Sequence, residues 1–206
     1  MPSDLQVDNI KDGTATKTLA TLSSSAVTLH SDVTFPPHHI VETKQTLFRS
    51  TVGVSYSDGY YPPSGFEVTT TAKVANVKFL INYAVSLGMT SGNDHNFSTG
   101  IFKDSDTDPL PETTNSGIKA SQTKTSMHSP GFWYVSSTGD HLMLLAGGQY
   151  LYTSSLAKDA SITFKIKVRQ GDGSNQIILV NYTGNDSNSE WMSRSVSQIT
   201  VQQIMP

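Results

Sequence analysis

The sequence contains no cysteine among its 206 residues. This absence excludes disulfide bonds, a thiolate nucleophile and a zinc site with sulfur ligands. Charged residues are also scarce, at 15% of the chain, against about 25% in an ordinary soluble domain. The lysines and arginines are scattered and the formal net charge is -3. The chain therefore lacks the basic face that binding to nucleic acid requires.

Long apolar runs are missing as well. The first 20 residues have no positively charged start followed by an apolar stretch, so we expect no secretion signal. The longest apolar run lies around Leu142–Gly148, far short of the ~20 residues that a transmembrane helix needs. We therefore expect a protein that is made in a cytoplasm and is not inserted into a membrane.

The motifs of the common enzyme classes are absent too. The sequence has no P-loop, no nucleophile elbow, no His-Glu-x-x-His motif and no dinucleotide-binding motif. A glycan depolymerase would need two carboxylates at a suitable separation. The glutamates lie in unrelated segments, at Glu42, Glu67, Glu112 and Glu190. We expect a non-enzymatic protein, with a depolymerase as the less favoured alternative.

Serine and threonine take the place of the missing charged residues. Threonine suits β-strands because its branched Cβ restricts χ1. Alternation of apolar and polar residues is clearest in Val77–Leu87, whose odd positions are all apolar or aromatic, and it recurs in Ser161–Val168. A period of two residues predicts half-buried strands.

Residues 1–37 differ from the rest of the chain. They contain short strand-like pieces with too few apolar residues to form a core, and they close at Phe35-Pro36-Pro37, a stiff boundary. We predict that residues 1–37 form an extended segment that anchors and trimerises the protein, and that residues 38–206 form a globular domain. The apolar residues expected to make the trimer and anchor contacts are Leu5, Val7, Ile10, Leu19, Leu22, Val27 and Leu29.

From His38 onward, strand signals alternate with turn signals that contain glycine and proline. The pattern predicts an all-β sandwich or jelly roll of roughly eight to ten strands. A strand over Ser195–Ile204 ties the end of the sequence into a sheet. In the strand expected over His141–Thr153, the pair Gly147-Gly148 predicts a β-bulge.

The last part of the sequence carries an ordered set of short motifs. Asn181, Gly184 and Asp186 form an Asn-x-x-Gly-x-Asp turn, followed by a polar Ser/Arg segment and a Ser-x-Ile-Thr-Val-x-x-Ile strand over Ser197–Ile204. Together with the opening Leu5–Ile10, this order resembles tail-fibre and virion knob proteins of marine and cyanobacterial phages. The resemblance implies a jelly roll of the TNF/C1q type that forms a homotrimer.

The resemblance also implies a structural role in a phage virion. We expect a trimeric fibre or knob subunit that binds other virion proteins through its N-terminal segment and contacts a host surface glycan or protein. Its location would be the tail fibre, the tail tip or the capsid surface. Two alternatives are a capsid decoration protein that stabilises the shell and a cellular C1q/TNF-like binding module.

Neither a metal site nor a cofactor is expected. Asp104, Asp106 and Asp108 alternate as in calcium loops, but Pro109 and Asn115 stand where an EF-hand has its glycine and glutamate. A solvated loop is the favoured interpretation. The adjacent His38 and His39 would point to opposite faces of a strand, which disfavours a shared metal ion.

Aromatic residues near the expected loops are the candidates for receptor contact. Tyr60, Tyr61 and Trp133 offer apolar area with a polar tip, which suits a sugar ring or a protein partner. The favoured alternative for such a cluster is packing in the core or in the trimer.

Overall fold

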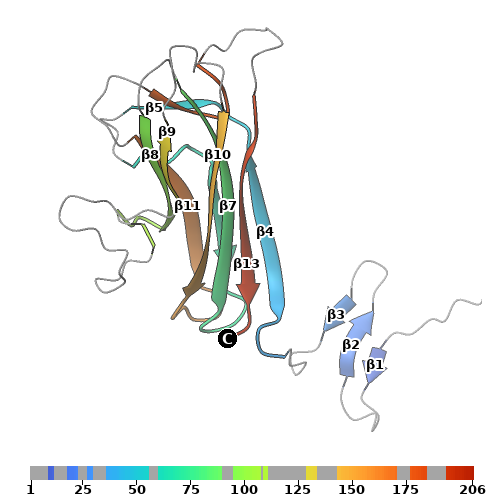
Figure 1. The fold of residues 1–206 in the computed structure, drawn as a ribbon. Coiled ribbons are helices and arrows are strands. Elements are labelled where there is room, and N and C mark those ends of the chain that lie inside the picture. Colours follow the sequence, from blue (N-terminus) through green and yellow to red (C-terminus); the bar gives the residue numbers. More distant parts are fainter. Residues whose placement is uncertain are drawn as a thin grey trace, which may run out of the picture. The chain divides into compact units, whose positions relative to one another are not determined.

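The structure is a computed structural model, drawn in Figure 1. It describes residues 9–11, 18–22, 27–29, 36–55, 60–89, 95–107, 109–110, 129–133, 143–170, 177–184 and 194–206. The chain divides into two compact units, Met1–His39 and Ile40–Pro206; the boundary expected after residue 37 lies close to this division. The described residues form strands, turns and irregular segments but no helix, so the all-β prediction is confirmed.

The first unit contains a three-stranded antiparallel sheet. Its strands are β1 (Asn9–Lys11), β2 (Thr18–Leu22) and β3 (Val27–Leu29), in the order β1-β2-β3. Among the predicted anchor residues, five lie in these strands: Ile10, Leu19, Leu22, Val27 and Leu29. Leu5 and Val7 lie outside the described residues. A role of these residues in anchoring or trimerisation stays a prediction.

Ten further strands are described in the second unit. They are β4 (Ile40–Phe48), β5 (Val52–Ser55), β6 (Glu67–Thr71), β7 (Lys78–Met89), β8 (His95–Lys103), β9 (Ser129–Trp133), β10 (Met143–Thr153), β11 (Ser161–Gln170), β12 (Ile177–Val180) and β13 (Ser197–Ile204). This number agrees with the strand count expected from the sequence.

The pairing of these strands is nested. β4 pairs with β13, β5 with β12, β6 with β11, β7 with β10 and β8 with β9, all antiparallel. The chain thus forms one long antiparallel ribbon. Further pairing of β7 with β12 and β13, and of β8 with β11, rolls this ribbon into two sheets. A ribbon rolled in this way is a jelly roll, as the resemblance implied.

The two sheets enclose one hydrophobic core. In the first sheet, β10 lies on one side of β7, and β13 and β12 follow each other along its other side, flanked by β4 and β5 (Figure 1). The second sheet has the order β6-β11-β8-β9. Phe79 and Ile81 of β7 are fully buried, as are Phe164 and Ile166 of β11. The core therefore rests on the two strands whose alternation is clearest in the sequence.

Strand β7 confirms the predicted alternation. Its odd positions from Val77 to Leu87 are all buried, so they point into the core. Its even positions, such as Leu80 and Asn82, therefore point to the outer side of the first sheet. The register with β10, β13 and β4 then assigns the paired residues of those strands to one of the two faces, and it shifts once, between the Glu42–Gln203 and Ile40–Ile204 pairs.

The predicted bulge at Gly147-Gly148 is wrong. β10 pairs with β7 in one unbroken register from Met143 to Thr153. Gly148 is needed because a side chain would not fit at this position. A Cβ on Gly148 would lie 2.8 Å from Cε1 of Tyr83, which is too close for two carbon atoms. Gly148 points inward and leaves room for the tyrosine ring in the core.

The strands define two ends of the jelly roll. At the base, Ile40 at the start of β4 pairs with Ile204 near the end of the chain. At the opposite end, the tip, Met143 pairs with Gly88, and Ile178 pairs with Met89. The chain enters the second unit at the base, because β4 begins there.

Candidate functional site

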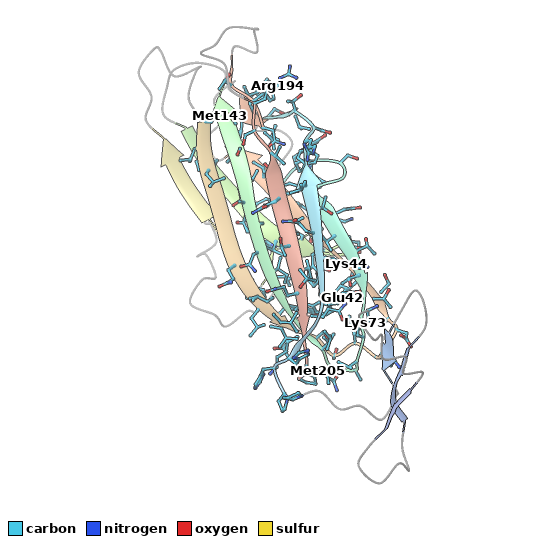
Figure 2. All side chains as sticks on the ribbon, turned by 90° about the vertical axis from the view of Figure 1, so that its right-hand side faces the viewer. Glu42, Lys44, Lys73, Met143, Arg194 and Met205 are labelled. Carbon is cyan, nitrogen blue, oxygen red and sulfur yellow. The ribbon has the colours of Figure 1, made fainter. Side chains whose placement is uncertain are left out.

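The outer face of the first sheet is almost free of charge. Figure 2 views this sheet face-on, with β10, β7, β13 and β4 side by side. Of the residues that the register points outward on these four strands, Lys78 at the base is the one ionisable group. The others are Ile40, Thr43, Gln45, Leu47, Leu80, Asn82, Ala84, Ser86, Gly88, Met143, Leu145, Gly147, Gln149, Leu151, Thr153, Gln198, Thr200, Gln202 and Ile204.

Large apolar side chains are exposed on the two outer strands of this face. Leu145 and Leu151, the β10 leucines, are 68% and 49% exposed. Ile40 and Leu47, the β4 apolar pair, are 45% and 46% exposed. Single exposed apolar residues are ordinary, but several on one uncharged sheet face are typical of a contact surface.

A row of amide and hydroxyl groups crosses the face between these apolar residues. Nε2 of Gln149 donates to Oδ1 of Asn82 at 2.6 Å. Nε2 of Gln45 lies 3.3 Å from both Oγ1 of Thr200 and Oε1 of Gln198. These polar groups bond to each other across neighbouring strands. A partner could therefore cover the middle of the face without supplying a charge.

The outer face of the second sheet has the opposite character. Lys165, Lys167 and Arg169 point outward at alternate positions of β11. Phe102 also points outward, yet it is fully buried, because the Tyr60 ring lies 5.0 Å away and Nζ of Lys167 lies 4.0 Å above its ring. The chain's own side chains thus cover this part of the second sheet.

Two of the three candidate receptor residues pack against the protein itself. Tyr60 is half-buried, its ring meets Phe102 edge-on, and burial raises the pKa of Tyr60. Tyr61 forms a β-bridge with Val168 and packs against the core. Trp133 is the last residue of β9, and its side chain lies outside the described residues. Tyr60 therefore helps to cover the second sheet and Tyr61 adds to the core, while receptor contact stays a prediction.

The aspartates of the calcium-like pattern are engaged with the protein. Oδ1 of Asp104 accepts a hydrogen bond from the Thr163 backbone N–H at 2.9 Å, and Oδ2 of Asp106 lies 2.8 Å from Nζ of Lys103. Asp108 lies outside the described residues. Within the part of the chain that the structure describes, no cluster of three metal-ligating side chains occurs, and no helix is long and apolar enough to cross a membrane.

Two of the motifs that resemble phage proteins, the turn that begins at Asn181 and the strand that begins at Ser197, are in contact in the structure. Oγ of Ser197 donates to Oδ1 of Asn181 at 2.5 Å, and Nδ2 of Asn181 donates to the carbonyls of Phe48 and Ser50. Asn181 is fully buried and has φ of 67°, a conformation that asparagine tolerates well. The Ser86 backbone N–H donates to the same Ser197 hydroxyl. These motif residues therefore hold β12, β13, β7 and the end of β4 together.

The exposed leucines were not among the residues singled out from the sequence. The signal for them is the loss of alternation, as in Leu144-Leu145 and Leu47-Phe48, where one residue faces inward and the next outward. A strand that is apolar on both sides is expected to be covered on both sides. That pattern distinguishes β10 and the end of β4 as strands that expose apolar residues on the outer face.

No protein-family model matches the sequence, and no curated protein matches it. Among the solved structures that align with this chain are one from zebrafish and one from a virus. The globular domain of zebrafish complement 1qA protein aligns at 12% identity and a TM-score of 0.33, covering 79% of this chain and 95% of that one. A chain from the structure of infectious bursal disease virus Gx strain aligns at 10% identity and a TM-score of 0.35, covering 89% and 40%. The jelly-roll assignment rests on the strand pairing and not on these likenesses.

Proposed function

We propose that this protein is a non-enzymatic structural subunit of a bacteriophage virion and that three copies form a knob. The observation that carries the trimer is the outer face of the first sheet, which is uncharged and exposes Leu145, Leu151, Leu47 and Ile40. Water contact of these side chains is unfavourable, and burying a whole leucine or isoleucine contributes about 1.5–3 kcal/mol.

Self-association suits this face better than binding to a charged partner. In a symmetric homo-oligomer the same residues recur around the axis, so a charged face would be brought close to like charges. On the outer face such repulsion is limited, because Lys78 is the one ionisable residue that points outward on β10, β7, β13 and β4.

The two ends of the second unit differ, and this difference supports a knob that is attached at one end. The N-terminal unit joins the chain at the base, where β4 begins. The ends of β7 and β9 and the start of β10 lie at the tip. We infer that the N-terminal unit binds other virion proteins and that the tip faces the host surface, where three copies would strengthen weak single contacts.

Native mass spectrometry tests the trimer. One chain has a mass of 22.3 kDa, so we expect a species of 3 × 22.3, about 67 kDa. The interface is apolar, so the trimer should persist at high salt, where contacts between surface charges weaken. A stable monomer at micromolar concentration would contradict the proposal.

Immunogold labelling of intact particles tests the virion assignment separately. Label on tail fibres or at the tail tip is the expected result. Label spread over the capsid would instead assign a decoration protein that stabilises the shell. Purified particles without any label would exclude a virion role while leaving the trimer unaffected.

A further inference from the structure

The exposed apolar residues on the two sides of the outer face have the same spacing. Through the register with β7, Leu145 lies level with Ser86 and Leu151 with Leu80, six residues apart. Through β13, Leu47 lies level with Ala84 and Ile40 with Lys78, again six β7 residues apart. Leu47 and Ile40 are seven residues apart in β4, and the register shift between the Glu42–Gln203 and Ile40–Ile204 pairs brings them to this spacing.

The two sets are also displaced by one common step. Leu145 lies two β7 residues nearer the tip than Leu47, and Leu151 lies two β7 residues nearer the tip than Ile40. Because the displacement is the same, a shift that places Leu145 beside Leu47 also places Leu151 beside Ile40. One rigid placement of β10 beside β4 of another copy would match both contacts.

We propose that, in the trimer, the β10 leucines of one copy pack against the β4 apolar pair of the next copy, with Leu145 on Leu47 and Leu151 on Ile40. This inference rests on the proposed trimer and specifies its interface. Each copy uses two different surfaces, and such a head-to-tail contact closes into a ring when the rotation suits it.

The common displacement fixes the inclination of the strands. Rotation about the three-fold axis moves no atom along that axis, so contacting residues must lie at equal height. Two residues along a strand correspond to about 7 Å, and the three strand spacings between β10 and β4 to about 14 Å. The strands are therefore inclined by about 25° to the axis, from the ratio of these two distances.

The polar row between the apolar residues is consistent with this arrangement. Gln149 with Asn82, and Gln45 with Thr200, already satisfy part of their hydrogen bonding within one copy. The contacts at the two sides of the face then need to supply only apolar packing. Leu145 is 68% exposed in the single chain. A polar partner protein would place polar groups against this side chain and would not provide apolar packing.

Cysteine cross-linking of the full chain tests the proposal, and the natural sequence has no cysteine to interfere. We expect the double variant Leu145→Cys/Leu47→Cys, when oxidised, to give a covalent trimer of about 67 kDa on a denaturing, non-reducing gel, from 3 × 22.3 kDa. A disulfide forms only where the two Cα atoms lie within about 7 Å. Both positions are largely exposed, so the fold should tolerate the changes.

The matched control is Leu145→Cys/Ile40→Cys, which uses the same two strands in the wrong register. These two residues are level with Ser86 and Lys78, eight β7 residues apart, and should give no covalent trimer. Equal cross-linking of the two double variants would overturn the proposed register. Covalent dimers from Leu145→Cys alone would indicate a two-fold contact between β10 strands and would also overturn it.

Native mass spectrometry of the reduced variants separates the two proposals. If the reduced Leu145→Cys/Leu47→Cys protein is a trimer but oxidation gives no covalent product, the register proposed here is wrong and the trimer stands. If the unmodified chain is a monomer, the proposed function fails together with this inference.

Discussion

At the scale of single residues, Tyr83 links the two sheets through the core. Its ring is buried, and its hydroxyl lies 2.7 Å from Oγ1 of Thr99 on β8. Burial raises the pKa of Tyr83 to about 12, against the hydrogen bond with Thr99, which lowers it. Gly148 leaves the space that this ring occupies.

Replacing Tyr83 with phenylalanine should destabilise the protein by about 1–3 kcal/mol, because the buried Thr99 hydroxyl loses its partner. Urea unfolding at neutral pH measures this loss. The double variant Tyr83→Phe/Thr99→Val should lose less than the sum of the single changes. Additive losses would show that the two hydroxyls contribute independently.

The raised pKa of Tyr83 also predicts a loss of stability in alkali. A buried tyrosine with a raised pKa stays protonated in the folded state, so its contribution is complete below the ordinary value of 10 and is lost as pH rises through about 12. The Tyr83→Phe variant should lack this part of the alkaline decline. The same decline in both proteins would assign it to other groups.

At the scale of elements, a polar seam joins the edges of the two sheets near the base. Oε2 of Glu42 on β4 accepts from Thr70 of β6 and Gln203 of β13, both at 2.6 Å, and Oε1 lies 3.1 Å from Nζ of Lys73. Figure 2 shows Glu42 and Lys73 at this end of the sheet. Burial pushes the pKa of Glu42 upward, but the hydrogen bonds and the Lys73 charge outweigh it and lower the pKa.

A Glu42→Gln variant tests the seam through its pH dependence. Because the folded pKa of Glu42 is below the ordinary 4.5, the carboxylate stabilises the fold above 4.5, and the effect is lost as pH falls through the lowered value. We expect the variant to be less stable by about 1 kcal/mol at pH 7, since the carboxylate is partly solvated. Thermal unfolding should show the two proteins converging in acid. A constant difference would contradict the assignment.

The strands of the core were predictable from the sequence, whereas the seam and the outer face were not. Alternation in β7 and β11 reports one buried side, and both strands lie where they were expected. Glu42 faces inward on an edge strand whose partner Gln203 is 161 residues away, and no local pattern encodes that pairing. The pairing of Leu145 with Ser86 likewise depends on how β10 and β7 align in the sheet, and the sequence of either strand alone does not show it.

At the scale of the whole molecule, a charge placed on the outer face should separate the copies. Leu145→Lys would bring an unpaired charge into each contact of the trimer, which costs several kcal/mol when desolvated. The side chain is 68% exposed in the single chain, so the fold should be retained. Sedimentation velocity should show a 22.3 kDa monomer, with circular dichroism unchanged.

The control for this change is Ser161→Lys, which adds the same charge to an exposed position of β11 on the second sheet. It should leave the trimer intact. A trimer that survives Leu145→Lys, or that is lost equally in both variants, would contradict the use of the outer face.

The nested pairing of the strands has a consequence for biosynthesis. β13 lies between β4 and β7, and its residue Thr200 pairs with Gln45, which is translated 155 residues earlier. The outer face is therefore incomplete until the ribosome has reached Ile204, and such non-local pairing makes folding slow. A chain that terminates early would lack the middle of this face. Assembly through this face would thus admit subunits that contain β13 and reject those that stop before it, without a separate proofreading step.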